Sequence, residues 1–487
     1  MKGITAELAG FAAGVRFAGL PAEVVERVTW HVLDSVGAGI AGSAKPWNAV
    51  VRRYALRETG PGACTLYGTA GTGRPEWAAL ANATAAHGFE IDDYALPALA
   101  HPGCVVVPVA LAVGEETAAR GHAVLAAAAA GFETVVRFGL ATTPSLTSDR
   151  GFHVTSVHGV FGAAAVACGL RGVDEDTTAS AYGLAASQAG GVTEYTRSGG
   201  EVKRLHAGLA AMAGIRAATL AADGFTGPRT AVEGPRGLLR AFVAEPRPAA
   251  LTAGLGERWE LHGLALKRYC VCAGIQAPLR AISELRAAGL ESADVGESAA
   301  GLGAGNVEKP VAGLDARDVE EIVVGLDAAT LAHVGAVGAY PRDMTEAQFS
   351  ARHAVAMHLV LGGNDPGHYE LLEQAGFALP EVSALAGRVR LEHDAEAEKS
   401  FPRRLLARVR IRLRDGRELR RLAEAPGSPA APMSGEEIEA KFLGLAEPVI
   451  GRRAARYVRD AVLALADDGP VLAVLAPAHE RYSRRSA

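Results

Sequence analysis

Alanine-rich sequence with few β-branched runs constrains the fold of the first half of this chain more than any other feature. From Met1 to about Phe242, apolar residues recur at helical spacing, and alanine dominates residues 121–138 and 205–224. Small side chains let helix backbones approach closely, which favours a large packed helical domain. Helices are predicted from Pro21 onward and at residues 6–20, 47–58, 77–86, 105–113 (beginning near Pro108), 121–138, 177–188 and 205–224.

The character of the sequence changes after Leu255. Residues 319–326 alternate as a strand does, and residues 389–392 and 407–413 also favour strands. Asp415 and Gly416 predict a turn that leads into a partner strand at 418–423. Helices are predicted at 275–287 and 345–361, a loop at 292–316, a linker at 425–432, and a return to helix at 434–466.

Composition excludes several classes of function. The chain has 49 Lys plus Arg and 54 Asp plus Glu among 487 residues, a net charge of −5, whereas nucleic-acid binders usually carry a basic stripe. Residues 151–170 lack charge, but polar residues in their first half favour a loop followed by a buried helix over a membrane span. Five scattered cysteines favour reduced thiols and a cytoplasmic location, and Glu7 interrupts any signal-peptide apolar run. We expect no nucleic-acid or membrane partner.

Motifs for common cofactors are missing from the sequence. No G-x-G-x-x-G follows a clear strand, and no P-loop, H-E-x-x-H or G-x-S-x-G occurs. Nucleotide cofactors and zinc hydrolysis are therefore not expected. Cys270 and Cys272 form C-x-C rather than a zinc pair, so the sequence predicts no metal site and no cofactor.

The stretch HGFEIDDYALPALAHPGCVVVP, residues 87–108, concentrates polar residues between two apolar segments. It contains Glu90, Asp93, Tyr94 and His101 on a predicted loop, and catalytic groups concentrate on loops held by rigid scaffolds. The alternative is a solvated acidic loop with a surface histidine.

Further polar clusters interrupt apolar sequence: GFHVTSVHG with His153 and His158, GGEVKRLHAG with Lys203 and His206, and LALKRYCVCAG with Lys267. Such groups are costly inside an apolar domain unless they are paired or used. Each has a structural alternative. His153 fits a satisfied core histidine, Lys203 a surface lysine at a helix start, and Lys267 a lysine at a strand edge. For His158 and His206 the structural role is preferred.

These clusters, in this order, resemble the MmgE/PrpD family, which includes 2-methylcitrate dehydratase, cis-aconitate decarboxylase and iminodisuccinate epimerase. The resemblance extends over nearly the whole chain. It is carried by the segments LPAEVVERVTWHVLDSVGAGIAG, HGFEIDDYALPALAHPG, GFHVTSVHGVFGAAAVACGLRGVD, KRLHAGLAAMAGIRAATLAADGFTGPRTAVEGPRGL, FSARHAVAMHLVLG and PMSGEEIEAKF.

The resemblance, together with the change near Leu255, implies a mainly α fold. We expect a large all-helical domain, discontinuous in sequence, at residues 1–265 and 430–487, and a smaller α+β lid domain at 266–429. The resemblance also implies a homodimer without an obligatory cofactor. It assigns catalytic roles to residues matching the family motifs, which are His101, His153, Lys203 and Lys267. It matches Asp93 to the last aspartate of the acidic loop.

The sequence departs from the family pattern in segments that face the substrate. Glu90 stands where the family usually has Asp, Tyr94 where Thr or Ser is usual, and Gln276 where many members have His. Arg268 replaces a common proline, and the loop from Asp93 to His101 is one residue longer. We expect Glu90, Asp93, Tyr94 and Gln276 to contact the substrate and to shape its specificity.

The implied reaction is proton abstraction next to a carboxylate of a small di- or tricarboxylic acid. Fixed positive charge must meet the developing enediolate, and lysines with histidines supply both charge and proton transfer. Loss of a hydroxyl group gives a dehydratase, loss of carbon dioxide a decarboxylase, and reprotonation on the other face an epimerase or isomerase. A non-catalytic carboxylate-binding relative is the remaining alternative.

Overall fold

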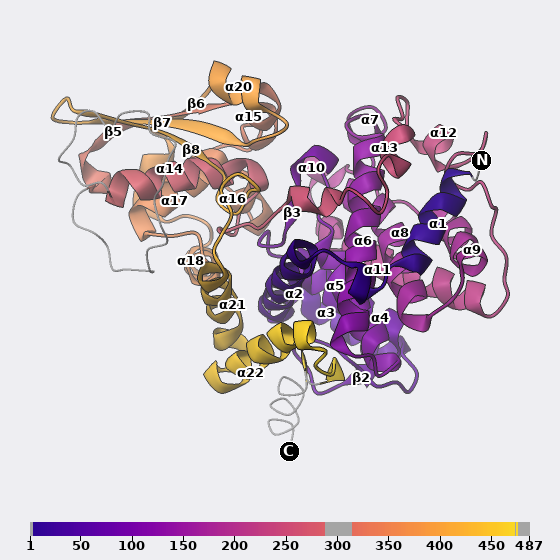
Figure 1. Cartoon of the computed structure of the whole chain (residues 1–487). Coiled ribbons are helices and arrows are strands. Elements are labelled where there is room, and N and C mark those ends of the chain that lie inside the picture. Colours follow the sequence, from indigo (N-terminus) through magenta and orange to yellow (C-terminus); the bar gives the residue numbers. More distant parts are fainter. Residues whose placement is uncertain (1–2, 288–313, 473, 476–487) are drawn as a thin grey trace. The chain divides into compact units, whose positions relative to one another are not determined.

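The computed structural model describes residues 3–287, 314–472 and 474–475. The chain divides into two compact units, Met1–Leu264 with Ile438–Ala487, and Ala265–Glu437. The first is mainly helical, and the second combines a mixed β-sheet with helices. The predicted fold class is confirmed. Figure 1 shows the elements of each unit.

The first unit is built from helices joined by short turns. Its longer helices are α1 (Ile4–Gly14), α2 (Ala22–Ser43), α3 (Pro46–Glu58), α4 (Pro75–His87), α5 (Gly103–Glu116), α6 (Gly121–Thr142), α8 (Val154–Arg171), α9 (Glu175–Ala186), α11 (Val202–Ala222), α21 (Gly435–Ile450, which starts just before the unit boundary) and α22 (Arg452–Leu463). Shorter pieces are η1 (Phe17–Gly19), β1 (Cys64–Thr65), β2 (Thr72–Gly73), β3 (Tyr94–Ala95), η2 (Leu96–Ala98), α7 (Ser145–Ser148), α10 (Tyr195–Ser198), α12 (Leu238–Phe242), α13 (Ala249–Thr252), η3 (Glu260–Gly263) and η6 (Ala464–Asp467).

Close helix packing in the first unit follows from its small residues. Helix α8 packs against α6 and α11, and α4 packs against α2 and α11. At the α2–α4 crossing, a methyl group on Gly42 would lie 2.0 Å from the backbone O of Ala85. A methyl group on Gly214 of α11 would lie 2.3 Å from Cβ of Ala163 on α8. These backbones approach as closely as they do because neither glycine has a side chain.

Three helices among the described residues, α6, α8 and α11, are long and apolar enough to cross a membrane by length and composition. Burial inside the protein covers 89%, 83% and 61% of their apolar windows, respectively. Their apolar surface is therefore largely covered by neighbouring helices, which accords with the interpretation of residues 151–170 as a buried segment.

Within the described part of the second unit, four strands form one sheet in the order β6-β5-β7-β8. They are β5 (Val319–Leu326), β6 (Val389–His393), β7 (Leu406–Leu413) and β8 (Glu418–Glu424). Strand β5 pairs parallel with β6 and antiparallel with β7, and β7 and β8 form the predicted hairpin. The remaining elements are β4 (Leu264–Ala265, which starts just before the unit boundary), η4 (Ala273–Ile275), α14 (Gln276–Ala287), η5 (Ala316–Asp318), α15 (Ala328–Val334), α16 (Met344–Phe349), α17 (Ala351–Leu361), α18 (Pro366–Gln374), α19 (Pro380–Ala386) and α20 (Ala395–Ser400).

Three predicted helices differ from those in the structure. The helix predicted at 6–20 ends at Gly14 and is followed by the separate turn η1. The helix predicted at 345–361 is two helices, because Ser350 is extended and caps α17 through the N–H of His353. Helix α5 begins at Gly103 and contains Pro108 in its interior, although Pro108 was expected near its start.

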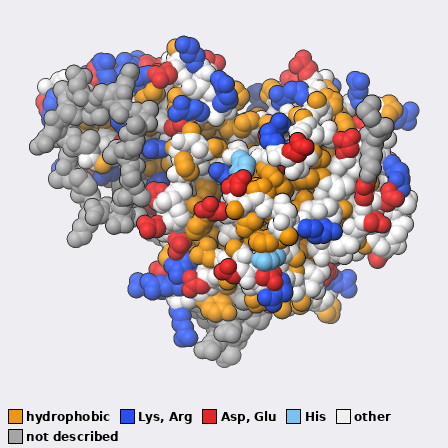
Figure 2. Space-filling model, in the orientation of Figure 1, with side chains coloured by type: hydrophobic (Ala, Val, Ile, Leu, Met, Phe, Trp, Pro, Cys, Tyr) orange, Lys and Arg blue, Asp and Glu red, His pale blue; other side chains and the backbone are white. Residues whose placement is uncertain are grey.

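Most of the loop predicted at 292–316 lies outside the described residues. On the face shown in Figure 2, basic and acidic side chains of the described residues are interspersed. This distribution accords with the small net charge of −5.

Candidate active site

Asp93 joins three parts of the first unit through a carboxylate that is almost completely buried. Its Oδ2 lies 3.0 Å from Nδ1 of His31 on α2, and its Oδ1 accepts a 2.8 Å hydrogen bond from the N–H of Gly103. A carboxylate at a helix N-terminus satisfies an unpaired backbone donor and the local dipole. A methyl group on Gly103 would lie 2.7 Å from Oδ2. Asp93 therefore holds the start of α5 and the loop before it.

The imidazole of His101 is oriented by that same loop. Its Nδ1 lies 2.7 Å from the backbone O of Asp93, so Nδ1 carries a hydrogen and donates it. The backbone N–H of His101 donates to Oγ1 of Thr155 on α8 at 3.0 Å. In a neutral imidazole with a hydrogen on Nδ1, Nε2 is the nitrogen that accepts a proton. The loop thus prepares His101 to act through Nε2.

His87, the last residue of α4, lies beside His101. Its Nδ1 lies 2.6 Å from Oδ2 of Asp92, and the same oxygen is 3.4 Å from Nδ1 of His101. The ring centroid of His87 lies 5.1 Å from that of His101 and 5.6 Å from that of His153. The end of α4 therefore contributes an imidazole that contacts both histidines predicted from the sequence.

His153 immediately precedes α8 and is paired with a second histidine. Its Nδ1 lies 3.1 Å from Nδ1 of His206, so one imidazole donates a hydrogen to the other. Burial lowers the pKa of His153 well below its ordinary value, and positive charge on neighbouring side chains lowers it further. Burial is also the main cause that lowers the pKa of His206 to about 4. The two rings are therefore neutral near pH 7, and one proton fixes the tautomers of both.

Lys203, in the first turn of α11, forms a buried ion pair with Glu90. Glu90 has φ of 55°, in the left-handed region that residues other than glycine rarely adopt. Such backbone strain is often found at functional sites. Next to Lys203, the guanidinium of Arg204 donates to the backbone O of Gly88 at 3.0 Å. Helix α11 is therefore fastened to the acidic loop at two adjacent residues.

The remaining predicted residues lie in β3 and in the second unit. Tyr94 is buried in β3. Lys267 is completely buried in the segment after β4, and Gln276 is buried at the start of α14. The amide of Gln276 accepts from the N–H groups of Arg268 and Tyr269 at 3.0 and 3.1 Å, and donates to Tyr269 O at 2.8 Å. Gln276 thus holds the backbone that follows Lys267.

The structure brings His101, His153 and Lys203 together within the first unit. It adds His87 and His206, which the sequence analysis did not propose as site residues. Two sequence signals point to them: His87 ends a helix five residues before Asp92, and His206 lies three positions after Lys203 on one helix. His158 is a core histidine, bonded to Thr142 at 3.0 Å and with its pKa lowered by burial to about 3.

Among the described residues, His87, Asp92 and Cys104 form a group that could hold a metal ion, with ligand atoms within 4.8 Å of one another. The side chains are already joined to protein partners. His87 contacts Asp92 at 2.6 Å, and Sγ of Cys104 donates to the backbone O of His101 at 3.1 Å. The donor set is compatible with zinc, whereas the observed distances are those of hydrogen bonds.

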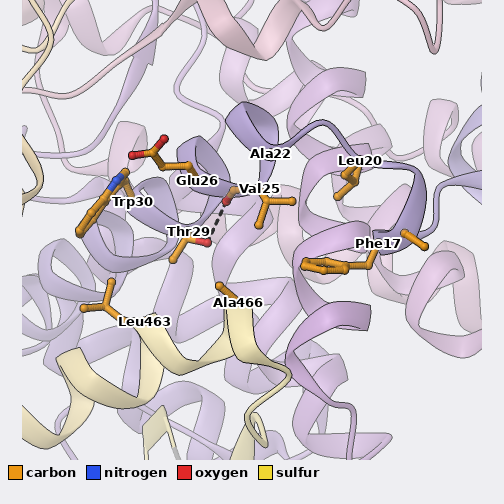
Figure 3. Close-up of a pocket in the computed structure, with 10 residues that line it drawn as sticks. Phe17, Leu20, Ala22, Val25, Glu26, Thr29, Trp30, Leu463 and Ala466 are labelled. Carbon is orange, nitrogen blue, oxygen red and sulfur yellow. Dashed lines mark hydrogen bonds between the residues drawn. The ribbon is translucent and has the colours of Figure 1, made fainter.

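Two surface hollows of the first unit lie elsewhere. One, of about 580 Å³, is lined mainly by apolar side chains of η1, α2, α22 and η6 (Figure 3). Its hydroxyl group, on Thr29, donates to the backbone O of Val25 at 2.8 Å. The second, of about 690 Å³, includes Arg74, Arg171 and Arg216. Neither is lined by the clustered histidines, so neither provides the acid–base chemistry expected from the sequence.

Comparison with known families finds matches in both units. Residues 6–250 match the MmgE/PrpD N-terminal domain, and residues 269–467 match the MmgE/PrpD C-terminal domain. The chain belongs to the MmgE/PrpD family. The resemblance inferred from the sequence motifs is therefore confirmed.

Several curated relatives are named for one reaction. Cis-aconitate decarboxylase of Aspergillus terreus (strain NIH 2624 / FGSC A1156) is 28% identical over 492 residues, which cover 97% of this chain and 96% of the relative. The cis-aconitate decarboxylase-like protein oryM of Aspergillus oryzae is 28% identical with the same coverage. Cis-aconitate decarboxylase of Homo sapiens is 29% identical over 276 residues, 55% of this chain and 56% of the relative.

Proposed function

We propose that this protein is a cofactor-independent lyase for a small di- or tricarboxylic acid, of the decarboxylase type. The observation that carries the proposal is the grouping of His101, His153 and Lys203, which places two imidazoles, one of them (His153) kept neutral by burial, near a buried cation. The names of the curated relatives support a decarboxylase over a dehydratase. We also propose, from the family resemblance and the cysteine content, a homodimer in the cytoplasm.

The histidines suit proton transfer near neutral pH. His101 acts through Nε2, because Nδ1 donates to the loop backbone. His153 is kept neutral by burial, so it can accept a proton and return it. In decarboxylation, the bond between the carboxylate carbon and the skeleton breaks and its electron pair stays on the skeleton. A histidine that has first taken up a proton from solvent delivers it to that carbon as carbon dioxide leaves, and the neutral imidazole is restored.

Lys203 is proposed to anchor a substrate carboxylate. Its present partner is the carboxylate of Glu90, so an arriving substrate carboxylate must share Lys203 with Glu90 or displace it. Both side chains are buried, and poor hydration strengthens the attraction between opposite charges. Glu90 thereby limits which acids bind, and Tyr94 is proposed to shape the same specificity.

Asp93 and Gln276 are proposed to act on the site indirectly. Each oxygen of the Asp93 carboxylate already contacts a protein partner, His31 or Gly103. The amide of Gln276 is bonded to the backbone after Lys267. We therefore assign to both a positioning role in place of the substrate contact expected from the sequence. Lys267 remains a proposed anchor or base for a second carboxylate.

A screen of candidate di- and tricarboxylic acids in deuterated water, followed by NMR, tests the proposal. A decarboxylase produces carbon dioxide and a product with deuterium at the former carboxylate-bearing or allylic carbon. A dehydratase produces an alkene without carbon dioxide, and an epimerase exchanges one C–H and inverts that centre. Binding without exchange or turnover for every acid would contradict a catalytic function and favour a carboxylate-binding protein.

A further inference from the structure

His153 depends on another side chain for the placement of its hydrogen. The hydrogen on Nδ1 of His101 is held by a backbone oxygen, that of Asp93, which side-chain substitutions leave in place. Among the described residues, Nδ1 of His153 has a side chain as its partner instead, Nδ1 of His206 at 3.1 Å. A hydrogen bond between two imidazole nitrogens contains one hydrogen, so one ring donates and the other accepts. The tautomer of His153 therefore follows from the role that His206 takes.

Helix α11 and the loop at Gly191 hold the two rings in contact. His206 lies on α11, which packs closely on α4 because a methyl group on Gly208 would overlap the backbone O of Leu80. The backbone N–H of His153 donates to the O of Gly191 at 2.9 Å. A methyl group on Gly191 would lie 3.3 Å from Cε1 of His206. The loop thus bonds to one histidine and packs on the ring of the other.

The direction of the hydrogen bond between the rings decides whether His153 can exchange protons. If His206 donated, His153 would carry its hydrogen on Nε2, and a proton could be added only at Nδ1, where two N–H groups would then face each other. If His153 donates, Nε2 takes up and releases the proton, and Nδ1–H stays bonded to His206 in both protonation states. A hydrogen bond from a charged donor is stronger than one from a neutral donor. As the acceptor, His206 therefore stabilises protonated His153, which burial disfavours.

We infer that His206 is a positioning residue for His153, which accepts the hydrogen on Nδ1 and leaves proton transfer to Nε2. The inference rests on the proposed acid–base function. A proton from solvent enters at Nε2 of His153 and leaves from the same atom to the substrate carbon, so none passes to His206. Lys203, the proposed carboxylate anchor, lies three positions earlier on α11. One helix then supplies both the cation that holds the substrate and the acceptor that holds the histidine.

Neutron diffraction from crystals of the substrate-free wild type at pH 7 tests the direction of the hydrogen bond. We expect a deuterium on Nδ1 of His153 and another on Nε2 of His206, with none on Nδ1 of His206. A deuterium on Nδ1 of His206 would overturn the inference. The measurement needs no substrate, so it is separate from the screen of carboxylic acids. Failure of every acid in that screen would contradict the proposed function, whereas the deuterium positions would still decide which ring accepts.

Replacements of His206 test the consequence for turnover of the acid that the screen identifies. In His206→Asn the amide oxygen lies near the position of Nδ1 and can still accept from His153. In His206→Phe the ring shape remains but the acceptor is lost. We expect His206→Phe to lower kcat by about 10- to 100-fold with little change in KM, and His206→Asn to recover much of that loss. Equal kcat per folded molecule in the two variants would overturn the inference, because the acceptor would then have no effect.

His158→Phe is the matched control for lost packing. It removes another completely buried imidazole, one that bonds to Thr142 outside the site. Its kcat per folded molecule should equal that of the wild type, with the folded fraction of every variant taken from thermal unfolding. A fall as large as that of His206→Phe would attribute both losses to packing and overturn the inference. If His206→Phe does not fold, the deuterium positions in the wild type decide the inference alone.

Discussion

At the residue scale, the site depends on imidazoles whose hydrogens are placed by protein partners, and burial keeps those of His153 and His206 neutral near pH 7. His153 and His206 share one hydrogen between their Nδ1 atoms, and His101 donates from Nδ1 to the backbone. Each ring therefore has its Nδ1 committed to a protein partner. Neutral histidines can accept a proton at pH 7 without first losing one.

Replacement of these histidines tests their role directly. We expect His101→Gln and His153→Gln each to lower kcat by about 100-fold or more, the usual scale for a general acid or base. Steady-state kinetics with the acid identified by NMR gives the measurement. His122→Gln replaces a partly exposed histidine that stacks on Phe17; it serves as the control and should keep full activity. Full turnover in both site variants would show that neither His101 nor His153 acts as a general acid or base.

Glu115 provides a separate test of burial and charge. Burial raises its pKa from 4.5 to about 7, although Thr65 donates to it from the backbone N–H at 2.7 Å and from the hydroxyl at 2.9 Å. Because the folded pKa is the higher one, its contribution to stability is fully present below pH 4.5 and is lost as the pH rises toward 7. The loss corresponds to about 3 kcal/mol.

Glu115→Gln should remove that part of the pH dependence. The free energy of unfolding of the variant, measured by denaturant titration, should change less than that of the wild type between pH 5 and pH 8. The exposed neighbour Glu116 gives the control, and Glu116→Gln should retain the wild-type dependence. If the free energy of unfolding changes with pH equally in Glu115→Gln and in the wild type, Glu115 has an ordinary pKa in the folded protein.

At the scale of elements, α2 and α4 pack together and each brings a histidine to the acidic loop, His31 to Asp93 and His87 to Asp92. Gly42 allows that approach, because a Cβ there would meet the backbone O of Ala85 at 2.0 Å. Gly42→Ala should therefore destabilise the protein by about 1–3 kcal/mol, the usual cost of overpacking. Gly444→Ala on α21 is the matched control.

The Gly444 control should behave in the opposite direction. A Cβ at Gly444 would meet nothing within 4 Å, and replacing glycine inside a helix restricts the unfolded chain. Thermal or denaturant unfolding should show stabilisation by about 0.5–1 kcal/mol. Similar small effects at both positions would mean that α2 and α4 can separate without cost.

Helix α21 is fastened to the same region by Lys441. Its ammonium forms an ion pair with Asp34 of α2 and donates to the backbone O of Ile91 at 2.9 Å. Burial raises the pKa of Asp34, and the charge of Lys441 opposes that rise. Lys441→Met leaves a buried carboxyl group without its cation, so we expect a loss of about 3 kcal/mol of stability.

An exposed ion pair between α21 and α22 serves as the comparison for the buried pair of Lys441 and Asp34. Arg452 lies 3.7 Å from Glu447, with its side chain 75% exposed, so Arg452→Met should change stability by less than about 1 kcal/mol. Denaturant unfolding of both variants measures the difference. If Lys441→Met is as mild as Arg452→Met, the buried pair does not fasten α21 to α2.

At the scale of the whole molecule, the family matches cover both units, and the curated relatives align along nearly the full chain. We expect the purified protein to turn over its substrate without added metal or organic cofactor. Activity should therefore survive dialysis against a strong chelator, measured by the same NMR assay. Loss of activity that one specific metal restores would contradict this expectation.

The sequence alone determined the fold class, the family and the identity of the main proposed site residues. Helical periodicity and alanine content are properties of short stretches of sequence, so they predicted the helices without a structure. The hairpin of β7 and β8 was predicted for the same reason, because its turn at Asp415 and Gly416 and its alternating strands are adjacent in sequence. The motif order around His101, His153 and Lys203 identified the family.

Tertiary structure decided what those residues contact. The pairs His31 with Asp93 and His153 with His206 join positions 62 and 53 residues apart, and no local pattern encodes such a contact. The start of α5 at Gly103 was also misjudged, because its N-terminal donor is satisfied by Asp93, ten residues earlier. Burial has the same origin: neighbouring helices exclude water from His153 and thereby lower its pKa, which the sequence of one segment cannot reveal.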